Sequence, residues 1–480
     1  MKIKTSAIVY GIRYIRRFGL RTLIIRIIEK KREKDSEYQS FYLETKASLE
    51  QLEKQRMEVS HWNKKEKISI VTPLYHTPAI FLRELIESVL ESSYENWQLC
   101  FADATQDGEE NQIENIVKEY QKMDEKLTGK KSRICYKKLS QNYGIAENTN
   151  QALAMAEGDY IAFLDHDDII TPDALYEMAL AAKCAKKTGK EANMFYSDED
   201  KVNENRTAFF EPHFKPDFNQ DLLNSNNYIT HFLMVSRELL DQVGGINKEY
   251  DGAQDYDFIL RCTELADNVI HIPKVLYHWR VHERSTAAGA GSKDYAIDAG
   301  KCAIESHLQR MGENGKVVVT PYFGFYRIEY GINTENKTED YVLFADQSLK
   351  PLNADWKQIL YADCSRKKIG VVGGKIYDRH HRIYEAAFFE KGDWTGAACG
   401  ENVFSGLREG YGGYMHRANI QMDCDRVSEK CMLVKKEVCY YRIKCRNSNI
   451  GSVYSNLLRY NIFNCKFSYF STKTINRKFR

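Results

Sequence analysis

The sequence predicts an α/β protein whose central sheet is mostly parallel, and three observations support this prediction. Short apolar strands alternate with amphipathic helices between residues 67 and 165. A hydrophobic content of 43% with 12% aromatic residues is typical of a globular chain. A length of 480 residues is enough for two or three domains and at least one large core.

The first half of the chain predicts four strands with a helix between each pair. The expected strands are 67–75, 97–103, 132–139 and 159–165, and the expected helices are 81–93, 111–123 and 145–158, the last stopped by Gly158. Helices that connect strands in this way imply parallel pairing, and ligands then bind at the carboxyl ends of the strands. Asp103 and Asp165 each end a strand, so both are expected at that edge.

The stretch "YIAFLDHDDIITPDALYEM", residues 160–178, combines a strand end with a helix start. Thr171 is expected as the N-cap of the helix, with Pro172 in its first turn and Asp173 favourable for its dipole. Three further carboxylates precede this cap, those of Asp165, Asp167 and Asp168. Crowded carboxylates repel one another unless a cation neutralises them, and Mg²⁺ or Mn²⁺ accepts such oxygen ligands.

Three stretches extend this pattern into a family resemblance. They read "ISIVTPLYHTPAIFLRELIESVLESSYENWQLCFAD", "NYGIAENTNQALAMAEGDYIAFLDHDD" and "VGGINKEYDGAQDYDFILR". Together they resemble the inverting glycosyltransferases of family 2, and the resemblance covers roughly residues 67–310. It implies a nucleotide-diphosphosugar transferase fold of the GT-A type.

The resemblance implies a nucleotide-sugar site formed at the ends of the first two strands and around the start of the third helix. The residues it assigns there are Thr72, Pro73, Tyr75, Asp103, Asn142, Gly144 and Asn148, together with Asp165 on the ribose and Arg280 on the phosphates. Many relatives carry a second acid after the one at Asp103, whereas this chain has Ala104. For Gly144, a simple helix-entry turn remains an alternative.

The resemblance also implies a Mg²⁺ or Mn²⁺ ion that stabilises the leaving diphosphate. Its ligands would be Asp165 and Asp167, with His282 or His278 completing the set, while a purely structural role for either histidine remains open. His166 is expected to line the pocket. The resemblance assigns the catalytic base, which takes the acceptor proton, to Asp255. Asp257 is the competing candidate, and helix capping is the alternative for both.

An acceptor site is expected between the donor motifs and the base. The residues expected to border it are Asp198, Glu199, Asn227 and His231, although a solvated charged loop is an alternative for the first two.

The second half contains an echo of the first. Residues 340–360 repeat the order of strand, acidic turn and helix start, but Ser348 replaces the second acid after Asp346. We therefore expect a truncated, non-catalytic glycosyltransferase-like domain, retained for packing or acceptor binding. The predicted divisions are an N-terminal segment 1–66, a catalytic domain 67–330, the truncated domain 331–443 and a weakly ordered basic tail 444–480.

Both ends of the chain are basic, although the net charge is only +2. Residues 1–34 predict a basic amphipathic helix, which could lie on an anionic membrane surface or pack on its own protein. The chain has no apolar run long enough for a transmembrane helix. Its twelve cysteines form no C-x-x-C pair and are expected to be free thiols of a reducing cytoplasm. The small net charge gives the chain no overall positive field that would favour nucleic acid as a partner.

The sequence thus predicts a cytoplasmic, metal-dependent inverting glycosyltransferase of bacterial surface-polysaccharide assembly. Its expected partners are a nucleotide-diphosphosugar donor and a saccharide or lipid-linked saccharide acceptor, with peripheral membrane contact through residues 1–34. Two alternatives remain, a non-catalytic carbohydrate-binding or scaffold protein and a sugar-nucleotidyltransferase. The latter would need a glycine-rich phosphate loop after the first strand, and "VTPLYHTP" has none.

Overall fold

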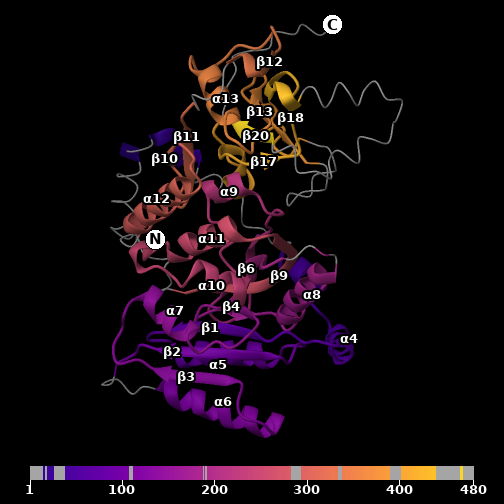
Figure 1. Cartoon of the computed structure of the whole chain (residues 1–480), viewed down its shortest axis with the longest axis vertical. Coiled ribbons are helices and arrows are strands. Elements are labelled where there is room, and N and C mark those ends of the chain that lie inside the picture. Colours follow the sequence, from indigo (N-terminus) through magenta and orange to yellow (C-terminus); the bar gives the residue numbers. More distant parts are fainter. Residues whose placement is uncertain are drawn as a thin grey trace. The chain divides into compact units, whose positions relative to one another are not determined.

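The computed structural model of the chain divides into two compact units (Figure 1). The described residues are 15–16, 19–25, 38–106, 112–187, 189, 192–282, 293–332, 338–389, 402–438 and 465–468. The N-terminal unit consists of Lys31–Phe218 and Tyr228–Ala303. The C-terminal unit consists of Met1–Lys30, Asn219–Asn227 and Ile304–Arg480. Sequence order suggested a boundary at residue 330, whereas the compact units divide inside the helix α12 (Lys293–Arg310).

One large sheet forms the centre of the N-terminal unit, with strand order β3-β2-β1-β4-β8-β6-β9-β5 and β7 paired to β6. The strands are β1 (Ile68–Leu74), β2 (Trp97–Asp103), β3 (Ile134–Lys138), β4 (Tyr160–Phe163), β5 (Ile169–Ile170), β6 (Met194–Asn203), β7 (Phe209–His213), β8 (Leu233–Ser236) and β9 (Val269–Val281). The first four are parallel, as predicted. β8 runs antiparallel to both β4 and β6.

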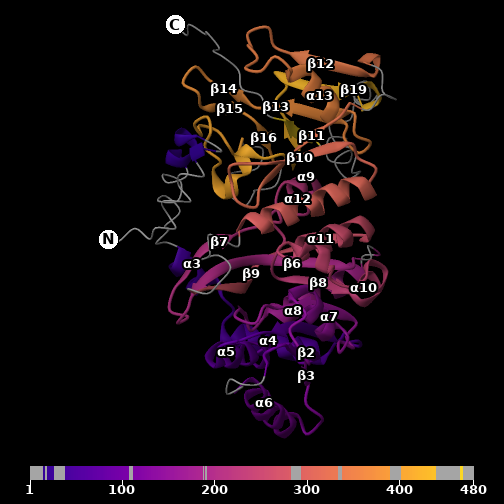
Figure 2. The same ribbon diagram turned by 90° about the vertical axis from the view of Figure 1, so that its left-hand side faces the viewer.

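Helices cover this sheet, and Figure 2 shows them from the side. They are α3 (Tyr38–Thr45), α4 (Leu49–Ser60), α5 (Ala79–Leu90), α6 (Gln112–Thr128), α7 (Ile145–Leu153), α8 (Ala174–Lys187), α10 (Arg237–Val243) and α11 (Gln254–Leu265), with the short turn η1 (Lys248–Tyr250) before α11. Apolar side chains such as those of Ile70, Phe101 and Leu85 are fully buried between sheet and helices. Because these strands are buried on both faces, their sequences are near-continuous apolar runs.

Two predicted helix ends differ from the structure. α7 ends at Leu153 rather than at Gly158. Gly158 instead allows a close approach of chain segments, since a Cβ atom there would lie 2.6 Å from the carbonyl oxygen of Lys67. α8 begins at Ala174, and the amide of Glu177 donates to the carbonyl of Asp173 at 3.0 Å. Asp173 therefore stands at the helix start, and Thr171 is not the N-cap.

The C-terminal unit is built on a smaller sheet of order β12-β19-β13-β20-β17. Its strands are β12 (Tyr341–Ala345), β13 (Val371–Gly374), β17 (Asp423–Cys424), β19 (Cys431–Lys435) and β20 (Cys465–Ser468). Three two-stranded ribbons accompany it: β10 (Gly315–Val319) with β11 (Tyr326–Tyr330), β14 (Ile376–Tyr377) with β15 (Ile383–Glu385), and β16 (Ala387–Phe388) with β18 (Arg426–Val427). Its helices are α9 (Gln220–Ser225) and α13 (Trp356–Cys364), with the short turns η3 (Thr338–Asp340) and η4 (Tyr414–Asn419).

The strand pairing of this smaller sheet repeats part of the larger one. In the N-terminal unit, Val235 of β8 pairs antiparallel with Ile161 of β4 and with Met194 of β6. In the C-terminal unit, Val434 of β19 pairs in the same way with Val342 of β12 and Val371 of β13. A helix follows the first strand in each case, α8 in one and α13 in the other. This topology agrees with the predicted echo.

The chain ends are described only in part. The predicted basic helix of residues 1–34 lies mostly outside the described residues, but residues 20–25 are helical. Within this segment Leu20 and Ile24 are exposed, whereas Ile25 is buried. Most of the predicted basic tail also lies outside the described residues; of this tail, β20 is described and pairs with β13. Within the described part of the chain, no helix is long and apolar enough to cross a membrane.

Candidate active site

Three carboxylates follow β4 in the tight turn that leads to β5, where the parallel strands end. Asp165, Asp168 and His231 can each offer one ligand atom, and these atoms lie within 4.8 Å of one another. Nε2 of His231 is 3.5 Å from Oδ2 of Asp165. Asp165 is exposed and Asp168 is buried, so the group reaches from the interior to solvent.

Asp168 is the buried anchor of this turn. Its Oδ2 accepts a hydrogen bond of 2.5 Å from the hydroxyl of Tyr277, and its Oδ1 accepts one of 2.7 Å from the amide of Arg280. Burial raises the pKa of the Asp168 carboxyl well above its ordinary value, and the negative charges of Asp167 and Asp165 raise it further. A divalent cation among these oxygens would relieve that repulsion. The donor set of two carboxylates and one imidazole therefore fits Mn²⁺ or Mg²⁺.

Asp167 points to a different partner. Its Oδ2 lies 2.8 Å from Nε2 of His282, and its Oδ1 lies 3.9 Å from Nδ1 of His166. The structure thus pairs two of the predicted metal ligands, Asp167 and His282, beside the group formed by Asp165, Asp168 and His231. His166 is partly buried, and its expected lining role stays a prediction.

His231 connects the carboxylate turn to a buried charged cluster on β6. Its ring stacks on Tyr277 at a centroid distance of 4.7 Å, and its Nδ1 lies 3.3 Å from Oε2 of Glu199. Burial alone would lower the pKa of His231, but the charge of Glu199 and the contact with Asp165 raise it well above its ordinary value. The raised pKa reflects the carboxylates on both sides of the ring, and a bound divalent ion would have to displace the ring proton and would then supply the positive charge between them.

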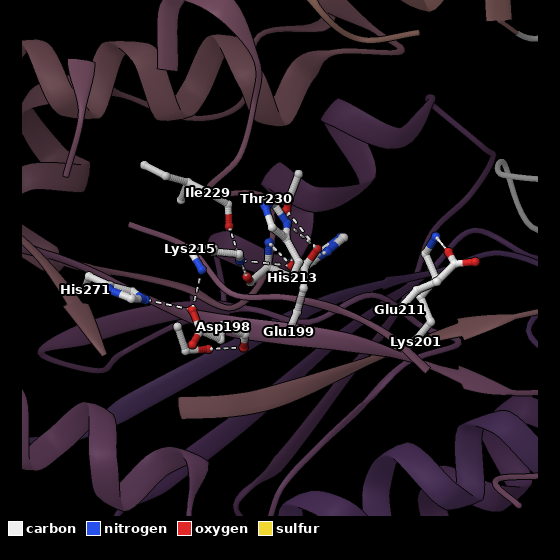
Figure 3. Close-up of polar contacts among 11 residues, drawn as sticks. Asp198, Glu199, Lys201, Glu211, His213, Lys215, Ile229, Thr230 and His271 are labelled. Carbon is white, nitrogen blue, oxygen red and sulfur yellow. Dashed lines mark hydrogen bonds and ion pairs between the residues drawn. The ribbon is translucent and has the colours of Figure 1, made fainter. Parts of the chain in front are cut away.

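Glu199 lies at the centre of this cluster (Figure 3). Its carboxylate is 3.0 Å from the buried ammonium of Lys215 and 3.5 Å from Nδ1 of His213, and it accepts a hydrogen bond of 3.2 Å from the hydroxyl of Thr230. Burial would raise the pKa of Glu199, but the charges of Lys215 and His231 hold it well below its ordinary value. Glu199 is thus a buried, ionised group rather than part of a solvated loop.

Asp198 is also buried, and its partners are structural. Its Oδ1 accepts a hydrogen bond of 2.8 Å from the amide of Lys215 and lies 2.8 Å from Nε2 of His271 (Figure 3). These contacts favour a supporting role over the predicted contact with acceptor. Asn227 belongs to the segment Asn219–Asn227 of the C-terminal unit, so this structure does not relate it to the other predicted acceptor residues.

Two predicted ligand-binding side chains are occupied by other groups, and both predictions need correction. His278 is buried, with Nδ1 2.5 Å from Oδ1 of Asp200 and Nε2 2.8 Å from the hydroxyl of Tyr42 on α3. Because both ring nitrogens are engaged, His278 does not complete the metal set. Arg280 is fully buried, donates from Nε to the carbonyl of Asp167 at 2.6 Å, and forms an ion pair of 2.6 Å with Glu84. It holds the carboxylate turn in place instead of facing a phosphate.

The residues expected around the nucleotide lie at the ends of β1 and β2 and before α7. Leu74 at the end of β1 pairs with Asp103 at the end of β2. Asp103 is fully buried and accepts a hydrogen bond of 2.7 Å from the hydroxyl of Tyr136. Thr72 is buried, and its hydroxyl has no hydrogen-bond partner among the described residues. Pro73 is partly buried and Tyr75 is exposed at the same edge.

The three residues predicted before α7 form a turn of their own. The side chain of Asn142 accepts from the amide of Gly144 at 3.0 Å and from the side chain of Asn148 at 2.8 Å. Gly144 precedes the helix with φ of +93°, a conformation that favours glycine. The helix-entry alternative for Gly144 therefore describes its local role.

The structure separates the two candidates for the catalytic base. Asp257 is buried and forms a salt bridge of 2.8 Å with Arg261 one turn along α11. Asp255, in the first turn of the same helix, has an exposed side chain. The surrounding protein nevertheless excludes enough water to raise the pKa of the Asp255 carboxyl, an effect that the positive charge of His231 opposes. Accessibility and a raised pKa suit Asp255 better for taking a proton.

Comparison with known proteins shows what the residues around this site are similar to. The family model described as Glycosyl transferase family 2 matches residues 69–244. The matched residues, which make up less than half of the chain, are similar to that family. The matched range includes β1 through α10 and thus the whole carboxylate turn, with Glu199 and His231.

Similar proteins were found among curated sequences and solved structures. The uncharacterized protein y4gI of Sinorhizobium fredii is 38% identical over 54% of this chain and 27% of its own length. The O-antigen biosynthesis protein RfbC of Myxococcus xanthus is 34% identical over 60% of this chain and 22% of its own. The structure of S. aureus TarS 1-349 aligns with a TM-score of 0.38 and 18% identity, covering 50% of this chain and 65% of TarS. The chain thus spans about a quarter of the length of the two curated relatives.

Sequence reasoning missed two members of the candidate metal group. Asp168 was available as the third acid of "DHDD", and His231 stood in "NYITHF" but was assigned to the acceptor. The family motif consists of two acids separated by one residue, which here are Asp165 and Asp167. It does not show that β9 brings Tyr277 and Arg280 against Asp168, or that β8 starts beside β4 and so places His231 there.

Proposed function

We propose that this protein is a metal-dependent inverting glycosyltransferase, which transfers a sugar from a nucleotide-diphosphosugar to a saccharide acceptor. The observation that carries the proposal is the group of Asp165, Asp168 and His231, which lies inside the range matched by the family 2 model. The exposed carboxyl of Asp255 is within electrostatic reach of His231 and Asp165. A base and a set of cation ligands are two components that an inverting displacement needs.

The chain's own residues supply the proton transfer and the charge balance. In the proposed step, Asp255 takes the proton of the acceptor hydroxyl as its oxygen forms a bond to the anomeric carbon. The bond from that carbon to the diphosphate breaks, and its electron pair leaves with the nucleoside diphosphate. Asp165, Asp168 and His231 would hold a Mn²⁺ or Mg²⁺ ion, which stabilises negative charge on the diphosphate when bound.

The nucleotide and acceptor sites are proposed from the same geometry. Thr72, with its buried hydroxyl, and the exposed ring of Tyr75 lie at the edge where the nucleotide of a parallel-sheet enzyme binds. Glu199 holds His231 beside the carboxylate turn, and we place the acceptor next to these two residues. An anionic membrane surface is a proposed contact of the N-terminal helix, supported by exposed Leu20, Arg21 and Ile24. A role in surface-polysaccharide assembly is supported by the similarity to the O-antigen biosynthesis protein.

The experiment is a panel of nucleotide sugars incubated with the full chain and Mn²⁺ or Mg²⁺, with release of nucleoside diphosphate as the readout. We expect turnover of at least one donor, loss of turnover with chelator, and strong loss with Asp255→Asn. The matched control is Asp241→Asn, an exposed aspartate on α10, which should retain full rate. Absence of both turnover and binding for every donor would refute the proposal. Full activity of Asp255→Asn would refute only the assignment of the base.

A further inference from the structure

The C-terminal unit contains a cavity of its own, with a volume of about 780 Å³. Its lining comes mainly from β11, from α13 with the residue before it, and from the connection between β13 and β14. All of its lining residues belong to the C-terminal unit. The cavity is therefore distinct from the carboxylate turn of the N-terminal unit.

The most buried part of the lining, here called the back of the cavity, holds a lysine. Lys375 is 1% exposed, and its Nζ donates a hydrogen bond of 2.8 Å to the carbonyl of Ala418. Its ammonium lies 5.5 Å from the ring centroid of Tyr377. Burying a lysine is unfavourable, and burial lowers the pKa of Lys375 to about 7. Such a group costs stability and is often retained for a ligand.

The internal echo places Lys375 at an informative position. Val371 of β13 corresponds to Met194 of β6, because each pairs with the equivalent valine of the neighbouring strand. Counting along both strands places Lys375 at the position of Asp198. The same backbone position thus holds a buried anion in one unit and a buried cation in the other. The fold itself demands neither charge there.

Charges of both signs line the cavity, and their balance disfavours a polyanion. Acidic side chains outnumber basic ones in its lining: Glu329, Asp355, Asp363 and Glu409 against Arg327 and Lys375. Arg327 and Glu329 pair with each other at the rim. A polyanion would meet the acidic side chains, which outnumber the basic ones. A neutral ligand rich in hydroxyl groups can instead donate to the carboxylates and accept from the cations.

The apolar part of the lining suits the same class of ligand. Tyr330 and Tyr377 offer aromatic surface, and Leu352 and Ile359 offer aliphatic surface. Rings with polar edges and C–H faces bind where aromatic side chains stand next to hydrogen-bonding groups. We propose that this cavity is a second saccharide-binding site, which takes a neutral oligosaccharide. That the natural ligand is the growing acceptor chain rests on the proposed transferase function.

The test measures binding of neutral oligosaccharides of glucose, N-acetylglucosamine and rhamnose to the full chain by saturation-transfer NMR and titration. Two rim variants, Asp355→Ala and Arg327→Ala, change exposed side chains and should leave the fold intact. We expect each to weaken binding by about tenfold or more, as for loss of a hydrogen bond to a charged group. Lys357→Ala, an exposed cation on α13 outside the cavity lining, should bind as the wild type does.

Each outcome decides the proposal. Binding that is lost in the rim variants and kept in Asp255→Asn supports the second site. Binding that is lost in Asp255→Asn but kept in both rim variants belongs to the catalytic domain and overturns it, as does absence of binding by any neutral oligosaccharide. Tighter binding of uronate oligosaccharides than of neutral ones would overturn the ligand class. Because a binding titration does not depend on donor turnover, failure of the proposed transferase activity would be seen separately.

Discussion

Replacing Lys375 by methionine should stabilise the C-terminal unit, and the gain should depend on pH. Methionine keeps the length of the side chain and removes the buried ammonium. The pKa of this amine falls from 10.5 to about 7 on folding. A pKa shift of one unit is about 1.4 kcal/mol, so this shift corresponds to a free-energy cost of about 5 kcal/mol for burying the charged amine. Changes in packing around the sulfur would alter this by about 1 kcal/mol.

The sign of the pH dependence follows from which state holds the proton. Below pH of about 7 the amine is charged in both states, so the full burial penalty acts on the wild type. Between about 7 and 10.5 the unfolded chain binds the proton while the folded chain does not, so wild-type stability rises with pH. The advantage of Lys375→Met should therefore be largest below pH 7 and shrink by about 3 kcal/mol by about pH 9.

Denaturant titrations with hydrogen exchange of peptides covering Val371–Tyr377 would measure this, because they report on the C-terminal unit by itself. Lys357→Met, at an exposed site on α13, is the control and should show no such pH dependence. Parallel pH profiles for wild type and Lys375→Met would show that Lys375 is solvated. The cavity would then have no buried charge at its back.

Three predictions concern the N-terminal unit. Glu199→Gln should destabilise it by about 3–5 kcal/mol in thermal unfolding, because buried Lys215 loses its counter-charge; Glu211→Gln, which removes the partner of the less buried Lys201, should cost less than about 1 kcal/mol. Asp168→Asn should weaken Mn²⁺ binding about tenfold or more in calorimetry. In the wild type, Mn²⁺ affinity should rise with pH because the metal competes with the proton whose pKa is raised, and a flat profile would contradict this role. Asp255→Asn should lower kcat by about 10²–10⁴ while donor affinity stays unchanged; equal losses in both would indicate a binding role.

Local sequence was most informative where burial and periodicity act over a few residues. The apolar runs around Ile70 and Phe101 predicted β1 and β2 because a parallel strand covered on both faces must be apolar throughout. The end of α7 was less predictable, because Gly158 serves the approach to Lys67 from a distant strand. A glycine required by close packing has the same appearance in sequence as one that ends a helix.

The sequence by itself determined the alternation of strands and helices, the acidic turn at the carboxyl end of β4, the resemblance to family 2 glycosyltransferases, and the repeated pattern around Asp346. These depend on local pattern and on motifs contiguous in the chain. Only the tertiary structure decided what each polar side chain touches. It assigned Arg280 to Glu84, His278 to Asp200 and Tyr42, and His231 to the carboxylate group. The physical reason is that a charged side chain is neutralised by whichever partner the fold brings within a few ångströms, and these partners come from strands and helices far apart in sequence.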